Sequence, residues 1–154
     1  MKKLAKNEFV LCCDQAIAEL LADHSFRLSS TRIDRWFTRA EFVNATTGLV
    51  FRHEIRDQRV FLDIARLVDG KIERQPLLIK ANSILHCYSF DDYLLVSQAN
   101  AGIASHLERK TPACEQVRWY AEQLRQHGVE LLMGEFGVFS ELDTVLKDRL
   151  MLRS

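Results

Sequence analysis

The sequence is poor in residues that interrupt regular structure, and it carries no net charge. Only two prolines and six glycines occur among its 154 residues, and 21 basic side chains balance 21 acidic ones. A general nucleic-acid binder needs a basic excess to displace counterions from phosphates, so this balance argues against such a role. No run approaches the roughly 18–20 apolar residues of a membrane helix. We therefore expect neither nucleic acid nor a membrane as partner.

The four cysteines have no spacing typical of a metal or redox site. Cys12 and Cys13 are neighbours, while Cys87 and Cys114 stand alone, without a Cys-x-x-Cys or Cys/His pattern. The apolar run that follows the basic N-terminus is broken by Asp14, which leaves it shorter than the roughly 7–15 residues of a signal peptide. We expect a cytoplasmic protein with reduced, buried cysteines and with no metal or cofactor.

The spacing of apolar residues predicts the fold. With 47% hydrophobic residues, the chain suits a single domain over 1–154. Helical spacing over 9–21 predicts an N-terminal helix. Alternating residues then predict strands over 26–33, 39–46, 49–56 and 60–65, with turns at Thr47-Gly48, Asp57-Gln58 and Asp69-Gly70. Because these connections are too short for parallel crossovers, we expect an antiparallel β-meander of three to four strands.

The remainder of the chain is mainly helical. Residues 77–88 fit either a strand or a short buried segment. Ser89 is predicted to cap a helix that runs toward Ala101. Thr111-Pro112 is predicted to start a further helix. That helix is predicted to end at His127-Gly128, where the glycine can adopt positive φ. A last helix begins near residue 139. This order of helices and strands predicts an α+β domain with C-terminal helices packed on one sheet face.

Few residue patterns point to catalysis. Asp91-Asp92 resembles half of a paired-carboxylate site, but two acids in the first turn of a helix explain it without chemistry. His53 lies on the apolar face of a predicted strand, where a core histidine is the simpler interpretation. No phosphate-binding glycine loop, Gly-x-Ser-x-Gly elbow or His-Glu-x-x-His helix occurs. We expect no enzyme and no catalytic residue.

Charge is unevenly distributed along the chain. Residues 25–70 carry eight basic and six acidic side chains, and residues 112–154 carry five and seven. We place an arginine-rich group on the solvent face of the sheet and an acidic stretch before the last helix as candidate binding residues, namely Arg52, Arg56, Arg59 and Arg66 in the first group and Glu130 and Glu135 in the second. Either group suits contact with another protein.

A family pattern occurs near the C-terminus, in the run Leu131-Leu132-Met133-Gly134-Glu135-Phe136-Gly137-Val138-Phe139-Ser140-Glu141-Leu142. It resembles the Leu-Leu-x-Gly-acid-Phe-x-x-Phe-x-x-Leu element of small uncharacterised bacterial α+β proteins, some of which are linked to polymorphic-toxin immunity. Glu135 stands where that pattern has Asp, and Gly137 stands where Ser is common. The resemblance implies no catalytic residue. The glycines of this run allow tight turns, and its phenylalanines can pack between the helices and the sheet.

These observations support three hypotheses about function. The first is a non-enzymatic protein that binds another protein, as an immunity protein that occludes a toxin. The alternative is a small enzyme or ligand-binding domain with a pocket between sheet and helices that uses Cys87 or a histidine. A third is self-association into a homodimer, because exposed hairpin edges can pair between chains.

Overall fold

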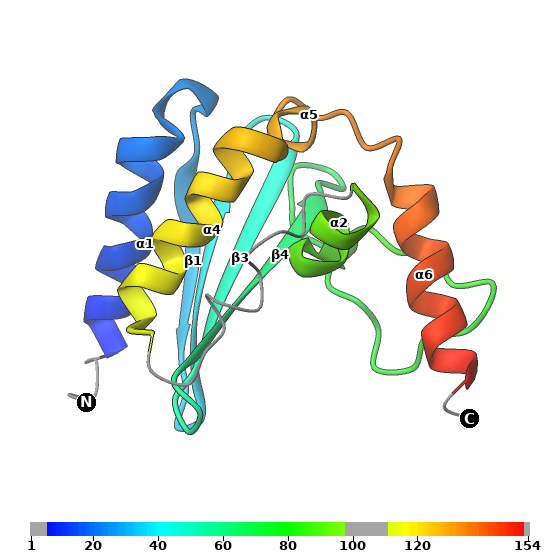
Figure 1. Ribbon diagram of the computed structural model, residues 1–154, viewed down its shortest axis with the longest axis horizontal. Helices are drawn as coiled ribbons and strands as arrows, with labels where there is room; N and C mark the ends of the chain where they lie inside the picture. The colour runs from blue at the N-terminus through cyan, green and yellow to red at the C-terminus, as the bar shows by residue number, and fades with distance from the viewer. Residues whose placement is uncertain (1–5, 98–110, 153–154) are drawn as a thin grey trace.

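The computed structural model describes residues 6–97 and 111–152 and has five antiparallel strands in one sheet (Figure 1). The strands lie in the order β1-β2-β3-β4-β5, so each pairs with its neighbour in sequence. The elements are α1 (Lys6–Leu20), η1 (Ala22–His24), β1 (Arg27–Ile33), β2 (Phe37–Val43), β3 (Thr47–Glu54), β4 (Arg59–Arg66), β5 (Cys87–Ser89), α2 (Phe90–Val96), α4 (Ala113–His127), α5 (Val129–Leu132) and α6 (Phe139–Leu152). The expected α+β fold is confirmed.

The sheet has one strand more than the three to four expected. The additional strand, β5, is short and pairs with β4 through Asp63↔Ser89 and Ala65↔Cys87. It lies in the segment that sequence alone left ambiguous, because three residues are too few for an alternating pattern to emerge.

The turn expected at Thr47-Gly48 is also misplaced. The chain turns before β3, where the side chain of Asn44 accepts hydrogen bonds from the amides of Thr46 and Thr47. Gly48 has another role, since a Cβ there would lie 2.5 Å from a side-chain carbon of Ile72. The glycine therefore permits a close packing contact.

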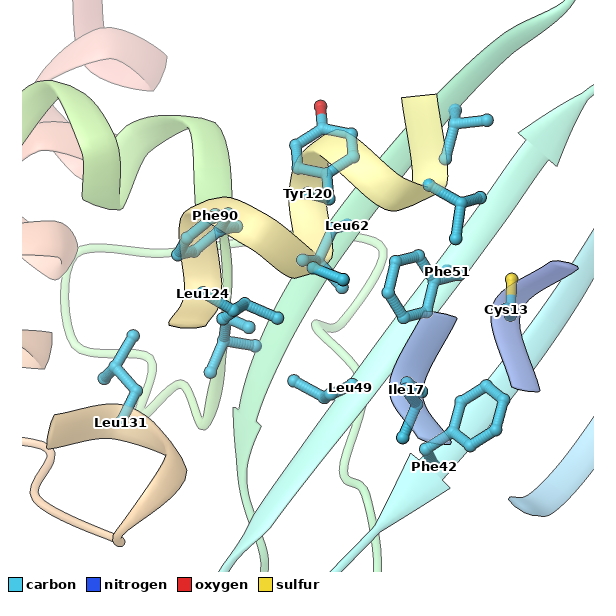
Figure 2. Packing of buried hydrophobic residues seen from close by; sticks show 14 of the residues in the cluster. Cys13, Ile17, Phe42, Leu49, Phe51, Leu62, Phe90, Tyr120, Leu124 and Leu131 are labelled. Carbon is cyan, nitrogen blue, oxygen red and sulfur yellow. The ribbon is translucent and has the colours of Figure 1, made fainter. Parts of the chain in front are cut away.

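Helices α1 and α4 lie side by side across one face of the sheet, and the core fills the space between (Figure 1). Figure 2 shows apolar side chains from both layers gathered between the helices and the sheet, among them Ile17, Phe42, Phe51, Leu62 and Leu124. All five are almost completely buried. Burying a large apolar side chain contributes about 1.5–3 kcal/mol, so this layer supplies the main stabilisation.

A disulfide between Cys12 and Cys114 joins α1 to α4, with their Cα atoms 5.5 Å apart. The expectation of four reduced cysteines is therefore wrong for this pair, because packing of the two helices brings together residues separated by 102 positions. Cys13 and Cys87 are free and buried, as expected.

The helix ends differ from the sequence prediction in detail. Ser89 occupies the N-cap of α2, but its side chain makes no capping hydrogen bond. Pro112, not Thr111, is the N-cap of α4. Gly128 follows α4 with φ of −109° rather than a positive value, because α5 begins at once. The expected extension of α2 toward Ala101 lies outside the described residues.

The run at residues 131–142 is largely architectural. Leu131 and Leu132 are buried in α5, and the hydroxyl of Thr47 donates to the carbonyl of Leu131 at 2.6 Å. Gly134 has φ of 86°, and a Cβ there would lie 2.8 Å from Cβ of Thr46. Phe139 is buried. The segment therefore fastens α5 and α6 to the sheet.

Candidate functional site

The sheet face opposite α1 and α4 is rich in arginine. Strand register places its residues, because side chains alternate between the two faces. Arg39 of β2 lies directly across from Arg52 of β3, and Arg52 lies across from Phe61 of β4. We call this surface the open sheet face and define it by Arg32, Phe37, Arg39, Glu41, Arg52, Glu54, Arg59, Phe61 and Asp63.

Two aromatic rings make cation–π contacts with four of these arginines. The guanidinium groups of Arg32 and Arg39 each lie 5.6 Å from the ring centre of Phe37. Those of Arg52 and Arg59 lie 5.0 Å and 4.8 Å from the ring centre of Phe61. Cation–π contact of this kind is worth about 0.5–1 kcal/mol at exposed positions. It orders each guanidinium while its N–H edges stay able to donate.

Part of the open sheet face is hollowed where residues 71–76 cross it. The hollow has a volume of about 200 Å³ and is lined by Arg39, Val50, Arg52, Asp63, Arg74, Gln75 and Cys87, which we call the arginine hollow. Glu41 anchors the crossing segment, since its Oε1 lies 3.2 Å from Nη2 of Arg74 and 3.5 Å from Nε of Arg39. Gln75 adds a hydrogen bond of 2.6 Å to the carbonyl of Cys87.

The arginine hollow contains a guanidinium N–H that an anionic ligand can engage. Burial and the nearby Arg74 guanidinium lower the pKa of Arg39, while Glu41 opposes that change. Nε of Arg52 is buried and makes no hydrogen bond, although Oε1 of Glu54 lies 3.5 Å away. Glu41 lies beside Arg39 and Arg74, and Glu54 lies beside Arg52, so a carboxylate placed here would gain mainly by accepting from the unused Nε–H of Arg52.

Asp63 is the acidic member of the hollow. Burial raises its pKa to about 6, while Arg52 acts in the opposite direction and Asp91 and Asp92 add to the rise. The carboxylate is therefore ionised at neutral pH at a cost in stability. It can accept a hydrogen bond from a ligand that carries a donor beside its anionic group.

Cys87 lines the hollow but is not activated for nucleophilic attack. Burial raises its pKa, and the carboxylates of Asp63 and Glu41 act in the same direction. A thiol that stays protonated is a poor nucleophile. Within residues 6–97 and 111–152, no three His, Cys, Asp or Glu side chains are placed to hold a metal ion. The arrangement suits binding through charge and hydrogen bonds.

The structure separates the four arginines predicted as one group. Arg52 lines the arginine hollow, and Arg59 lies on the same face above Phe61. Arg56 is exposed in the turn between β3 and β4. Placing Arg66 on the solvent face is wrong, because it lies across from Thr47 on the helix-covered face. There its Nη2 lies 3.0 Å from Nδ1 of His86.

The two predicted acidic residues lie together but away from the open sheet face. Glu130 belongs to α5, Glu135 follows it, and the amide of Glu135 donates to the carbonyl of Glu130 at 2.9 Å. Both side chains are exposed. They form a small acidic surface at the α5 turn.

Sequence reasoning missed Arg39, Asp63 and Arg74. Arg39 could have been found, because a correct turn at residues 44–46 places it opposite Arg52. Asp63 alternates with apolar residues of β4 and reads as an ordinary exposed acid. Arg74 lies in an irregular segment, so no periodicity indicates where its side chain points.

The remaining candidates have structural roles. His53 is buried against the ring of Phe9, with centroids 5.1 Å apart, and burial lowers its pKa. Asp91 and Asp92 lie in the first turn of α2, where Asp91 accepts a hydrogen bond of 2.9 Å from Tyr120 and Asp92 pairs with Arg149 at 2.9 Å. The interpretation of these acids as a helix N-terminus is confirmed.

The helices were compared with what a membrane span requires, and the chain was compared with known proteins. None of the helices described is long and apolar enough to cross a membrane. No family model, curated protein or solved structure matches the chain.

Proposed function

We propose that this chain is a non-enzymatic protein that binds an acidic partner protein on its open sheet face. The arginine hollow carries this proposal, because it combines three guanidiniums with a cavity and an unsatisfied buried N–H. Arginine and aromatic residues are the side chains most enriched at interface hot spots. A partner carboxylate entering the hollow would gain charge-assisted hydrogen bonds.

The cation–π pairs contribute by reducing the entropy lost on binding. Ordering a long side chain at an interface costs about 0.5–1.5 kcal/mol. Phe37 and Phe61 already order Arg32, Arg39, Arg52 and Arg59 in the free protein. The same positive charges would accelerate encounter with an acidic surface.

In this proposal the protein acts by occlusion, as an immunity protein that covers an acidic surface of a toxin. The family pattern at residues 131–142 supports that role. A cytoplasmic location is part of the same proposal, and the Cys12–Cys114 disulfide opposes it, because disulfides persist mainly in oxidising compartments. Cell fractionation with thiol labelling would decide between the two.

Co-expression tests the occlusion role. If a large toxin-like gene lies beside the gene for this chain, co-expression should rescue cells from its product. A variant with Arg52→Gln and Arg74→Gln should lose the rescue. The control variant Arg118→Gln and Arg125→Gln removes the same charge from α4, on the other side of the sheet, and should rescue normally. Absence of rescue by the wild type, or full rescue by the hollow variant, would contradict the proposal.

Self-association is tested separately. The edge strand β1 is exposed at all seven residues, so its outer backbone groups are accessible. Arg27 and Arg32 are its charged residues, and an antiparallel pair of β1 strands would bring these like charges together. Charged side chains on an edge strand oppose such pairing. We therefore expect a monomer.

A further inference from the structure

A second concave site lies between the end of the sheet and α6, on the face opposite the arginine hollow. It has a volume of about 500 Å³ and is formed by Arg66 of β4, Tyr88 of β5, residues 81–85, and the start of α6 with the residues before it. Sites for small molecules commonly enclose about 300–1,000 Å³. Its residues are not those of the proposed protein-binding surface.

Aromatic side chains form one wall of this pocket, which we call the α6 pocket. The ring of Phe139 lies 4.8 Å from that of Tyr88 and 4.9 Å from that of Phe136. Ile84 also lines the pocket and is 79% exposed. A flat apolar group placed here would cover Ile84 and contact the phenylalanines.

A fixed polar network forms another wall. The hydroxyl of Tyr88 donates to Oδ1 of Asp143 at 2.7 Å, and Nζ of Lys147 lies 2.9 Å from Oδ2 of the same carboxylate. Lys147 also donates to the carbonyl of Ser83 at 2.7 Å. Burial alone would raise the pKa of Asp143, but the hydrogen bonds from Tyr88 and Lys147 lower it. Asp143 is therefore an anion with both oxygens engaged.

Arg66 is the cation of the pocket that has no acidic partner among the described residues. Its guanidinium lies against Nδ1 of His86 and 5.7 Å from the ring centre of Phe139. Lys147 is compensated by Asp143, so the pocket retains one net positive charge from Arg66. A guanidinium has five N–H donors, and His86 engages only part of them.

We propose that the α6 pocket binds a small organic anion with a flat apolar body, such as an aromatic carboxylate or aromatic phosphate. The anionic group pairs with Arg66, and the ring lies between Phe136, Phe139 and Ile84. The hypothesis of a ligand pocket between sheet and helices is thereby kept, but with Arg66 in place of Cys87 or a catalytic histidine. It is independent of the protein-binding role.

Isothermal titration calorimetry with 2-naphthoate tests the site, and the neutral 2-naphthol serves as the matched ligand. Wild-type protein should bind 2-naphthoate more tightly than 2-naphthol. Arg66→Gln should weaken 2-naphthoate by at least about tenfold, the loss expected for a charge-assisted hydrogen bond, and should leave 2-naphthol unchanged. Substituting 2-naphthyl phosphate for 2-naphthoate shows which anionic group is preferred, and tighter binding of either supports the site.

Two further variants separate ligand binding from folding. Ile84→Ser changes an exposed side chain, so it should fold normally and bind both ligands more weakly. Arg59→Gln removes an exposed arginine from the open sheet face and should bind like the wild type. No binding of 2-naphthoate by the wild type, or equal binding by the wild type and Arg66→Gln, would overturn the proposal.

Discussion

Reducing the Cys12–Cys114 disulfide should cost much of the stability of this protein. The bond closes a loop of 102 residues, which includes the whole sheet. In the chain-entropy treatment, a cross-link around a loop of about 100 residues lowers the entropy of the unfolded chain by an amount worth about 4.7 kcal/mol at 25 °C. Small domains have total stabilities of about 5–15 kcal/mol. Loss of the bond would therefore remove a large share of the total.

Urea unfolding with and without a reducing agent measures this contribution. With a urea dependence of about 2 kcal/mol per molar, a loss of about 4.7 kcal/mol lowers the unfolding midpoint by about 2.3 M. The double variant Cys12→Ser and Cys114→Ser should unfold at the midpoint of the reduced wild type and should not respond to reductant. Cys13 and Cys87 are free, so they cannot produce a reductant effect of this kind.

Two results would refute this reasoning. One is an unchanged midpoint after complete reduction, which would show that α1 and α4 hold their packing without the cross-link. The other is the absence, under non-reducing conditions, of a cross-linked peptide containing Cys12 and Cys114. Mass spectrometry of a proteolytic digest would detect that peptide.

Three further predictions concern stability and assembly. Asp63→Asn should raise the free energy of unfolding at pH 7 by about 1–2 kcal/mol. Burial raises the pKa of Asp63 to about 6, so its charge destabilises the folded protein at pH 7, and the substitution removes that charge. The side chain is partly exposed, which reduces the cost of the charge. The gain should shrink as the pH falls from about 6 to about 4, because the carboxyl group of the wild type becomes protonated first in the folded and then in the unfolded state. A gain in stability that does not depend on pH would contradict this prediction. Gly134→Ala should lower the free energy of unfolding by about 1–2 kcal/mol or more, since φ is 86° and a Cβ would lie 2.8 Å from Thr46. The control Gly137→Ala should change the free energy of unfolding little in the same urea titration, because no atom lies within 4 Å of its Cβ position. Light scattering should give the mass of one chain, because Arg27 and Arg32 oppose pairing of β1, and a concentration-dependent dimer would contradict this expectation.

The elements with strong periodic patterns could be predicted from the sequence. The N-terminal helix and the alternating strands β3 and β4 follow from the spacing of residues such as Phe9, Ile17, Phe51 and Leu62, all of which are buried. The segment of β5 was left ambiguous and α5 was missed, because these elements have three and four residues, too few for a periodic pattern. Their positions depend on contacts with distant segments, such as the hydrogen bond from Thr47 to the carbonyl of Leu131.

The candidate site was predicted only in part, for a similar reason. Arg52 and Arg59 follow from strand alternation, whereas Arg66 was assigned to the wrong face. The arginine hollow needs residues 71–76 to cross the sheet, and no local pattern indicates that path. Likewise the disulfide depends on the packing of α1 against α4, which places Cys12 beside Cys114.

The central claim is that arginines of the open sheet face bind an acidic partner, and a dissociation constant tests it most directly. The partner, captured with the wild-type chain from its native host and then purified, is titrated against three forms of this protein. Arg52→Gln with Arg74→Gln should bind at least about tenfold more weakly than the wild type, a loss of about 1.4 kcal/mol or more. Arg118→Gln with Arg125→Gln should bind like the wild type. Equal affinity for all three forms would contradict the account.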